Sequence, residues 1–301
     1  MNYEQTLIER ALADERIIVM TAENRAPVKS APQALGSRFI DTGITEQCMI
    51  GAAAGLALRG RIVVAHALAT FLTLRAFEFI RTDVGIANLP VKLVGFAAGF
   101  LSDGNGPTHQ AIEDVSLLRG IPNMKVFCPA DHSELVAGLP EILRDPSPWY
   151  VRYNTRSAVI ERHEAFVIGK AEQLSDGTDV AILVYGMLVQ EALEATKLLQ
   201  SQGIGVRLVN LRTVKPIDEA AVLQAISATK LIVTVEDHFL SGGLYTILAE
   251  ICLRNRLAPN VLPIAFDNRW FTPGRLGEVL EHEGFTGSQL ADKILAKVKE
   301  R

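Results

Sequence analysis

The segment "GITEQCMIGAAAGLALRGRIVVAHAL", residues 43–68, sets the architecture of the chain. Its first part, 45–59, is apolar and rich in alanine and glycine, which predicts a helix that packs closely against its neighbours. Its last part, 61–68, is a β-branched run of strand length that begins just after Gly60. A helix that leads directly into a buried strand is typical of α/β folds, in which helices cover a mainly parallel sheet.

The same alternation continues along the chain. Apolar runs predict strands at 16–20, 61–68, 91–97, 124–130 and 149–153, separated by helices at 45–59, 71–88, 112–120 and 131–144. After an irregular charged segment at 154–164, strands follow at 179–186, 206–212, 230–237 and 261–267, with helices at 188–203, 217–228, 242–254 and 286–300. We therefore expect two doubly wound α/β domains with mainly parallel sheets, at 1–156 and 171–301, joined by a linker at 157–170.

Composition excludes several classes of protein. The 301 residues are 49% hydrophobic, so the chain can bury a sizeable core and divide into two domains. A net charge of -4, with acids and bases interspersed, gives no reason to expect nucleic acid or a membrane as the main partner. Three cysteines, none in a C-x-x-C pair, favour reduced thiols and no structural metal site. No apolar run reaches membrane-spanning length, and residues 1–15 lack signal-peptide features, so a cytoplasmic protein is expected.

Glu46 begins the apolar helix directly after a Gly-Ile-Thr turn. A purely structural explanation is available, because Thr45 can cap the helix and the helix dipole favours an acidic side chain in the first turn. From the local pattern alone, this structural role is the more frequent one for such a glutamate.

A second polar cluster, "SDGNGPTHQAIED" at 102–114, follows the strand predicted at 91–97. Its glycines and proline predict a tight loop that places His109 at the carboxyl edge of the sheet, where ligands bind in open α/β folds. A lone loop histidine more often hydrogen-bonds its own turn. A second candidate at another strand edge shifts the balance toward function.

Three further features have competing interpretations. Phe71, Leu74 and Phe77 recur at helical spacing, a pattern more typical of core than of a cofactor wall. Arg152 fits either a solvated strand end or an anchor for phosphate or carboxylate. The sequence "VEDHFLSGG", residues 235–243, places a possible Asp-His pair before two glycines, but it lacks the G-x-G-x-x-G order of a nucleotide site.

Together these motifs resemble the C-terminal half of transketolase. The resemblance rests on "GITEQCMIGAAAGLA", "HALATFLTLRAFEFIR", "GPTHQAIEDVSLLRGIPNMKVFCPAD", "NLRTVKPID" and "VEDHFLSGGL", in this order. It implies a thiamine diphosphate pyrimidine-binding domain followed by a transketolase C-terminal domain. It also implies the small subunit of a split transketolase, encoded without the diphosphate-binding domain.

The resemblance also assigns roles to residues. Glu46 is expected to hydrogen-bond the N1′ atom of the thiamine aminopyrimidine and favour its imino tautomer, a general acid–base role that suits a desolvated carboxyl. His109 is expected to approach the aminopyrimidine and the substrate. The implied cofactor contacts are Glu46, Ile44, Phe71, Leu74 and Phe77, and the implied substrate contacts are Arg152, Asn105, Asp103 and Arg25.

Some positions depart from the family pattern. Asn105 replaces the usual acidic residue, and Ala97 falls near the histidine that contacts sugar hydroxyls. The family's phosphate-binding serine segment reads "AENRAPVKS" here, and its usual N-terminal arginine is absent near Asn2. Arg25 can substitute for one of these two residues. The Asp103-Gly104 pair lacks the preceding glycine and the following asparagines of the family's metal motif, so no magnesium site is expected on this chain.

We therefore expect a thiamine diphosphate-dependent transferase of two-carbon ketol units. Its Mg²⁺ ligands are expected from a separate diphosphate-binding transketolase subunit, in an α2β2 heterotetramer. One alternative is the beta subunit of a 2-oxo acid dehydrogenase, although "GPTHQ" followed by "PNMKVFCPAD" fits transketolase better. Another is a non-catalytic interface subunit, which the matching Glu46, Phe71 and His109 argue against.

Overall fold

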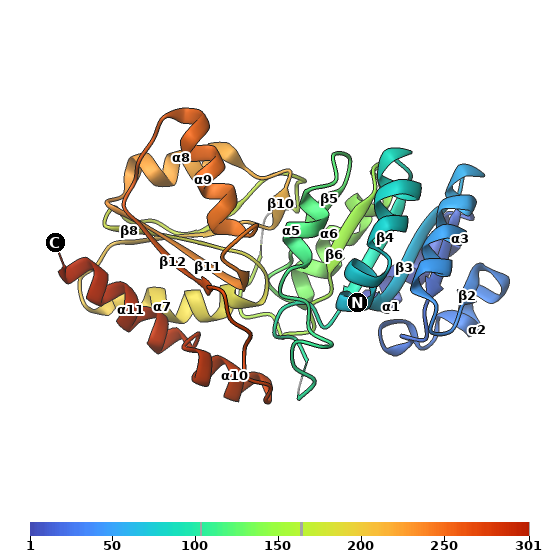
Figure 1. The fold of residues 1–301 in the computed structure, drawn as a ribbon, viewed down its shortest axis with the longest axis horizontal. Coiled ribbons are helices and arrows are strands. Elements are labelled where there is room, and N and C mark those ends of the chain that lie inside the picture. Colours follow the sequence, from blue (N-terminus) through green and yellow to red (C-terminus); the bar gives the residue numbers. More distant parts are fainter. Residues whose placement is uncertain (103, 163–164, 301) are drawn as a thin grey trace.

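The computed structural model describes residues 1–102, 104–162 and 165–300. Two sheets dominate the described residues, one at each end of the molecule (Figure 1). The larger sheet has the strand order β10-β5-β6-β4-β3-β1-β2, and the smaller has the order β12-β11-β8-β9-β7. Pairing is parallel in both except at β10 and β7, which confirms the predicted fold class.

The first half of the chain supplies most of the larger sheet. Its strands are β1 (Ile17–Thr21), β2 (Phe39–Asp41), β3 (Ile62–Leu68), β4 (Val91–Phe96), β5 (Lys125–Phe127) and β6 (Trp149–Arg152). Its α-helices are α1 (Tyr3–Ala13), α2 (Ala31–Leu35), α3 (Glu46–Leu58), α4 (Phe77–Phe79), α5 (Asp114–Arg119) and α6 (His132–Arg144). Short 3₁₀ turns occur at η1 (Ala26–Val28) and η2 (Gly36–Arg38). The apolar clusters place α1, α2 and α6 on one face of the sheet, and α3 and α5 on the other.

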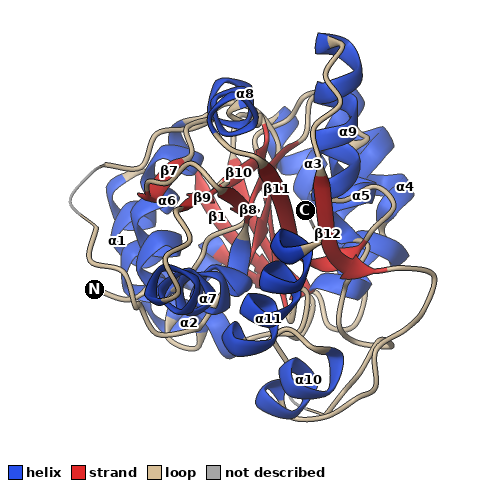
Figure 2. Ribbon diagram, turned by 90° about the vertical axis from the view of Figure 1, so that its left-hand side faces the viewer, coloured by secondary structure: helices blue, strands red, loops and turns tan. Residues whose placement is uncertain are grey.

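The second half builds the smaller sheet. Its strands are β7 (Glu172–Ser175), β8 (Val180–Val184), β9 (Val206–Asn210), β11 (Leu231–Phe239) and β12 (Val261–Phe266). Its helices are α7 (Val189–Ser201), α8 (Glu219–Ala228), α9 (Leu244–Asn255), α10 (Leu276–Glu283) and α11 (Gly287–Lys299), with the 3₁₀ turn η5 (Gly186–Leu188). Helices α8 and α9 cover one face of this sheet, and α7 and α11 the other (Figures 1 and 2). Because both faces are covered, the central strand β8 is buried at every position.

One strand crosses the predicted domain boundary. Strand β10 (Thr213–Lys215) comes from the second half of the chain but pairs antiparallel with β5, at the edge of the first sheet. The division at 157–170 therefore does not separate the two sheets completely. Pairing with β10 satisfies backbone groups of β5 that would otherwise lie at an open sheet edge.

The helix predicted at 71–88 is irregular. Two π-helical segments, η3 (Phe71–Arg75) and η4 (Ile80–Ile86), flank the short helix α4. The predicted stripe of Phe71, Leu74 and Phe77 is correspondingly split, with Leu74 exposed and Phe77 packed against the core beneath α3. Such π-helical turns occur frequently at functional sites.

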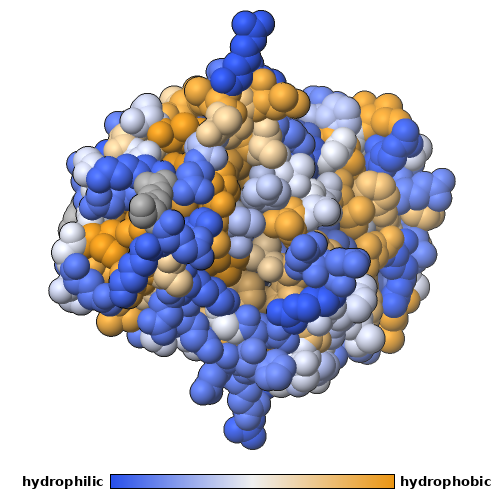
Figure 3. Space-filling model, turned by 60° about the vertical axis from the view of Figure 1, so that its left-hand side comes forward, coloured by the Kyte–Doolittle hydropathy of each residue, from blue (hydrophilic) through white to orange (hydrophobic). Residues whose placement is uncertain are grey.

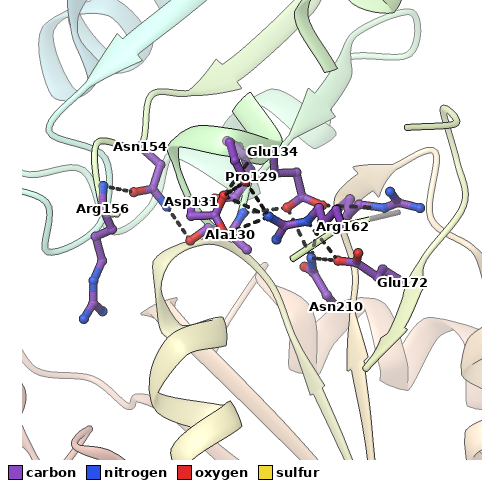
Figure 4. Close-up of polar contacts among 11 residues, drawn as sticks. Pro129, Ala130, Asp131, Glu134, Asn154, Arg156, Arg162, Glu172 and Asn210 are labelled. Carbon is purple, nitrogen blue, oxygen red and sulfur yellow. Dashed lines mark hydrogen bonds and ion pairs between the residues drawn. The ribbon is translucent and has the colours of Figure 1, made fainter. Parts of the chain in front are cut away.

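A polar cluster ties the linker to both domains (Figure 4). Arg162 donates to Asp131 at the start of α6 at 2.8 Å and to Glu172 in β7 at 3.3 Å. Asn210 of β9 donates to Glu134 of α6 at 3.2 Å. Burial raises the pKa of Glu134 to about 7, against the opposing effect of the Arg162 guanidinium. The cluster joins α6 to the edge of the second sheet.

The face of the molecule shown in Figure 3 carries several hydrophobic patches that lie between hydrophilic ones. One apolar groove, lined mainly by α9 and the segment after it, exposes Leu253 and Leu257.

Across the described residues, every helix is too short or too polar to cross a membrane.

Candidate active site

Glu46 starts α3 without the predicted cap. The Thr45 hydroxyl donates to the carbonyl oxygen of Thr42 at 2.8 Å, and Thr45 makes no side-chain capping bond. The preceding turn is held instead by Asp41, whose carboxylate accepts from the Gly43 amide at 2.9 Å. Glu46 is only 2% exposed, which is unusual for a glutamate that merely starts a surface helix.

Glu46 lines a pocket of about 410 Å³ at the carboxyl edge of the first sheet, which we call the Glu46 pocket. Its apolar walls include Phe71, and Ile44 is largely exposed beside it. The full lining is Ala22, Glu23, Asn24, Ile44, Glu46, Leu68, Phe71 and Phe96. Three of the expected cofactor residues, Glu46, Ile44 and Phe71, therefore meet at one pocket.

Arg75 is the principal contact that the sequence analysis missed. Its Nη1 lies 2.8 Å from Glu46 Oε2, and its guanidinium carbon lies 4.3 Å from the centre of the Phe71 ring. The signal in the sequence is a basic residue beside the apolar stripe of Phe71, Leu74 and Phe77. That signal does not reveal a partner 29 residues away.

His109 lies beside the same aromatic ring. The rings of His109 and Phe71 meet edge to face, with their centres 5.2 Å apart. The His109 Nδ1 atom is 2.8 Å from the Thr108 hydroxyl, which fixes the tilt of the imidazole. The structure therefore places His109 against Phe71. The imidazole also makes a hydrogen bond to Thr108 in its own turn.

The second domain supports the His109 loop. The Gly104 amide donates to the carbonyl oxygen of Gly274 at 2.9 Å. Gly106 has a φ of +70°, and a side chain there would come within 2.5 Å of Pro273. Glycine is therefore required at position 106 both for its backbone conformation and for this close approach.

Other expected contacts do not join the pocket. Leu74 points outward, and Asn105 is exposed with its amide on the Ser102 hydroxyl at 2.7 Å. Arg25 is exposed and pairs with Asp41 at 2.6 Å. Asp103 lies outside the described residues.

Arg152 is neither a solvated strand end nor a free anion anchor. It is 3% exposed, and its guanidinium binds Asp114 at 2.9 Å and Asp237 at 2.7 Å. Gly99 lies against this cluster, where a side chain would collide with the Asp237 carboxylate. Burial contradicts the solvated strand end, and two carboxylates from different domains engage the guanidinium, so a role as an anion anchor stays a prediction.

In the segment "VEDH" of the second domain, Glu236 and His238 also make structural hydrogen bonds. Glu236 accepts the backbone N–H groups of Leu244 and Tyr245 at the start of α9, and burial raises its pKa to about 7. His238 Nε2 accepts from the Ser116 amide at 3.2 Å, so Nδ1 donates to the Phe239 carbonyl. Burial lowers the pKa of His238 to about 4, and the ring is neutral.

No metal cluster is evident in the part of the chain that the structure describes. There, no three His, Cys, Asp or Glu side chains are arranged to hold an ion. The residues of the Glu46 pocket fit the pyrimidine end of a thiamine cofactor, since a buried carboxylate stands beside apolar walls.

Comparisons with known proteins agree with this architecture. Residues 1–159 match the model of the transketolase pyrimidine-binding domain, and residues 169–290 match that of the transketolase C-terminal domain. The chain belongs to the transketolase family, whose members depend on thiamine diphosphate.

Among its relatives, the 6-deoxy-6-sulfo-D-fructose transketolase subunit SqwH of Clostridium sp. (strain MSTE9) is 42% identical over 83% of this chain and 79% of that protein. An apulose-4-phosphate transketolase subunit of Phocaeicola vulgatus is 32% identical over 99% of this chain and 95% of that protein. A solved structure described as a split gene transketolase, inactive beta4 tetramer, has a TM-score of 0.88. It shares 32% identity and covers 99% of this chain and 97% of that one.

Proposed function

We propose that this chain is the pyrimidine-binding subunit of a thiamine diphosphate-dependent transketolase-like transferase. It moves a two-carbon ketol unit between ketose and aldose substrates, together with a separate diphosphate-binding subunit. The observation that supports this most strongly is that Glu46 and Phe71 line one pocket while His109 lies against the Phe71 ring.

Each of these residues has a distinct proposed role. Glu46 exchanges a proton with the pyrimidine nitrogen N1′, which is general acid–base work in a site that excludes water. Phe71 provides an aromatic wall for the pyrimidine, and His109 faces the reacting groups from across that ring. The bound cofactor supplies the carbanion-stabilising chemistry.

A partner subunit completes the proposed site. A diphosphate is usually held through Mg²⁺, and the described residues offer no ligand cluster for that ion. Ile44, Leu74 and Phe79 are exposed apolar residues close to the start of α3 and the irregular segment that packs on it, and they suit burial against another chain. The names of the two relatives describe them as subunits, and the solved relative is an inactive tetramer of beta chains. An α2β2 heterotetramer is the assembly we propose.

Substrate recognition is proposed to differ from that implied by the family pattern. With Arg152 engaged by Asp114 and Asp237, the exposed Arg25 and Asn105 are the proposed substrate contacts of this chain. The two relatives named above are described as acting on substrates with different acidic groups, a sulfonate and a phosphate.

Three free thiols suit a reducing compartment, so the proposed location of the assembly is the cytoplasm.

Reconstitution tests this function. The chain is purified with a diphosphate-binding subunit, thiamine diphosphate and Mg²⁺, and is then offered xylulose 5-phosphate, apulose 4-phosphate and 6-deoxy-6-sulfo-D-fructose with an aldose acceptor. Ketol transfer from at least one donor is expected, with little activity on xylulose 5-phosphate because of Ala97 and Asn105. A stable, cofactor-loaded assembly that transfers no ketol unit would contradict the proposal.

A further inference from the structure

Among the described residues, Arg75 contacts both Glu46 and Phe71 with its charged group. It lies at the end of η3, four residues after Phe71, so the two side chains share one side of the segment. Its guanidinium combines an ion pair to Glu46 Oε2 at 2.8 Å with stacking over the Phe71 ring at 4.3 Å. Arginine suits both contacts because its planar group donates along its edge and stacks on its face.

The guanidinium approaches both residues from outside the Glu46 pocket. Glu46 and Phe71 line the pocket, whereas Arg75 is absent from its described lining and has a side chain that is 40% exposed. Within the described residues, the Glu46 carboxylate has one hydrogen-bond partner, which is Arg75 on Oε2. The Oε1 atom is therefore available to a ligand in the pocket.

We propose that Arg75 is a positioning residue for Glu46. It fixes the orientation of the carboxylate through Oε2 and directs Oε1 toward the pyrimidine nitrogen of the cofactor. This inference rests on the proposed function and assigns a role that the family resemblance did not give to this position.

The ion pair also separates the two carboxylate oxygens by role. With Oε2 engaged by Arg75 at 2.8 Å, Oε1 would be the atom that exchanges a proton with N1′ of a bound cofactor. The same guanidinium holds the Phe71 ring from the side away from the pocket.

Substitution of Arg75 in the assembled enzyme tests this role. Arg75→Met keeps a side chain of similar reach over Phe71 but removes the charge, whereas Arg75→Lys keeps the charge. Arg59→Met is the matched control, since Arg59 is exposed at the other end of α3 and its side chain makes no polar contact within the described residues. Each complex is characterised by calorimetric titration with thiamine diphosphate and Mg²⁺, by near-ultraviolet circular dichroism of the imino tautomer, and by kcat.

Arg75→Met is expected to bind the cofactor nearly as well as the unmodified chain. It should show a weakened imino signal and a kcat lowered by about 10-fold or more, as for a disturbed acid–base group. Arg75→Lys should recover part of both, and Arg59→Met should match the unmodified chain.

An unchanged imino signal and kcat in Arg75→Met would overturn the inference, as would a defect confined to cofactor affinity. Glu46→Gln, measured alongside, separates this failure from failure of the proposed function. If Glu46→Gln is inactive while Arg75→Met is fully active, only the role of Arg75 fails. If Glu46→Gln is also fully active, the proposed function itself fails.

Discussion

Arg152 and Asp237 lie 2.7 Å apart and join the ends of two strands in different sheets, β6 and β11. Asp114 binds the same guanidinium at 2.9 Å, and all three side chains are buried. Desolvation raises the pKa of Asp237, although Arg152 opposes the shift. Because each partner needs the others to remain buried at low cost, this cluster is a structural tie between the domains.

Arg152→Ala should therefore destabilise the fold rather than weaken one class of substrate. Removal of the guanidinium leaves two buried carboxylates without a countercharge, which costs about 3 to 5 kcal/mol. Urea unfolding of the purified chain measures this loss. Arg16→Ala is the control, because Arg16 pairs with Asp14 at the surface, where water and salt screen such pairs and they contribute little to stability.

The same variant distinguishes the structural tie from an anion anchor. In the reconstituted enzyme, Arg152→Ala should change KM similarly for phosphorylated and uncharged donors. A variant as stable as Arg16→Ala, with KM raised only for anionic donors, would restore the anchor that the sequence suggested.

Glu46→Gln should leave folding and assembly intact but abolish turnover. An amide cannot give up the proton that the proposed chemistry requires, and loss of an acid–base group costs at least about 10²-fold in rate. The kcat of the assembled variant and its thermal unfolding midpoint are the two measurements. Near-normal turnover would return Glu46 to the role of a helix-starting residue.

His66 gives the stability of the chain a pH dependence. The ring is buried between the Tyr3 hydroxyl, at 2.8 Å, and the Met20 carbonyl, and burial lowers its pKa from 6.5 to about 4. The folded state favours the neutral ring, whereas the unfolded chain binds a proton at this histidine once the pH falls below 6.5. The contribution of His66 to the free energy of unfolding is therefore complete above pH 6.5 and is lost as the pH falls toward 4. At about 1.4 kcal/mol per pKa unit, the loss is about 3 kcal/mol.

His66→Gln should remove this part of the pH dependence, because glutamine offers a donor and an acceptor but does not titrate. The free energy of unfolding of the unmodified chain should fall relative to that of the variant between pH 6.5 and 4. His282→Gln, at an exposed position, should leave the pH profile unchanged. Parallel profiles for the unmodified chain and His66→Gln would contradict the assignment.

The sequence predicted the buried strands well because they are continuous apolar runs. It missed β2, β7 and β10, which have three or four residues each and lie at or near sheet edges. In β7, "EQLS" has no apolar run, since its backbone pairing rather than side-chain burial makes it a strand.

Where a local motif carried the residue, as for Glu46 and His109, the structure places that residue beside Phe71, and its catalytic role stays a prediction. The sequence did not reveal the contacts of Arg75 and Arg152, whose partners are 29 or more residues away in the chain. A charged residue in an apolar pattern signals that a partner exists, but only the three-dimensional packing identifies it. The helical spacing at 71–88 predicts one continuous helix and does not distinguish π-helical turns from regular ones.

The dependence on a partner subunit is the central claim, and calorimetric titration with thiamine diphosphate and Mg²⁺ tests it most directly. The chain contributes the Glu46 pocket, but its described residues offer no cluster for the metal that holds a diphosphate. The chain alone should therefore show no tight binding and no ketol transfer, and the addition of a diphosphate-binding subunit should produce both. Micromolar binding with ketol transfer by this chain alone would contradict the account.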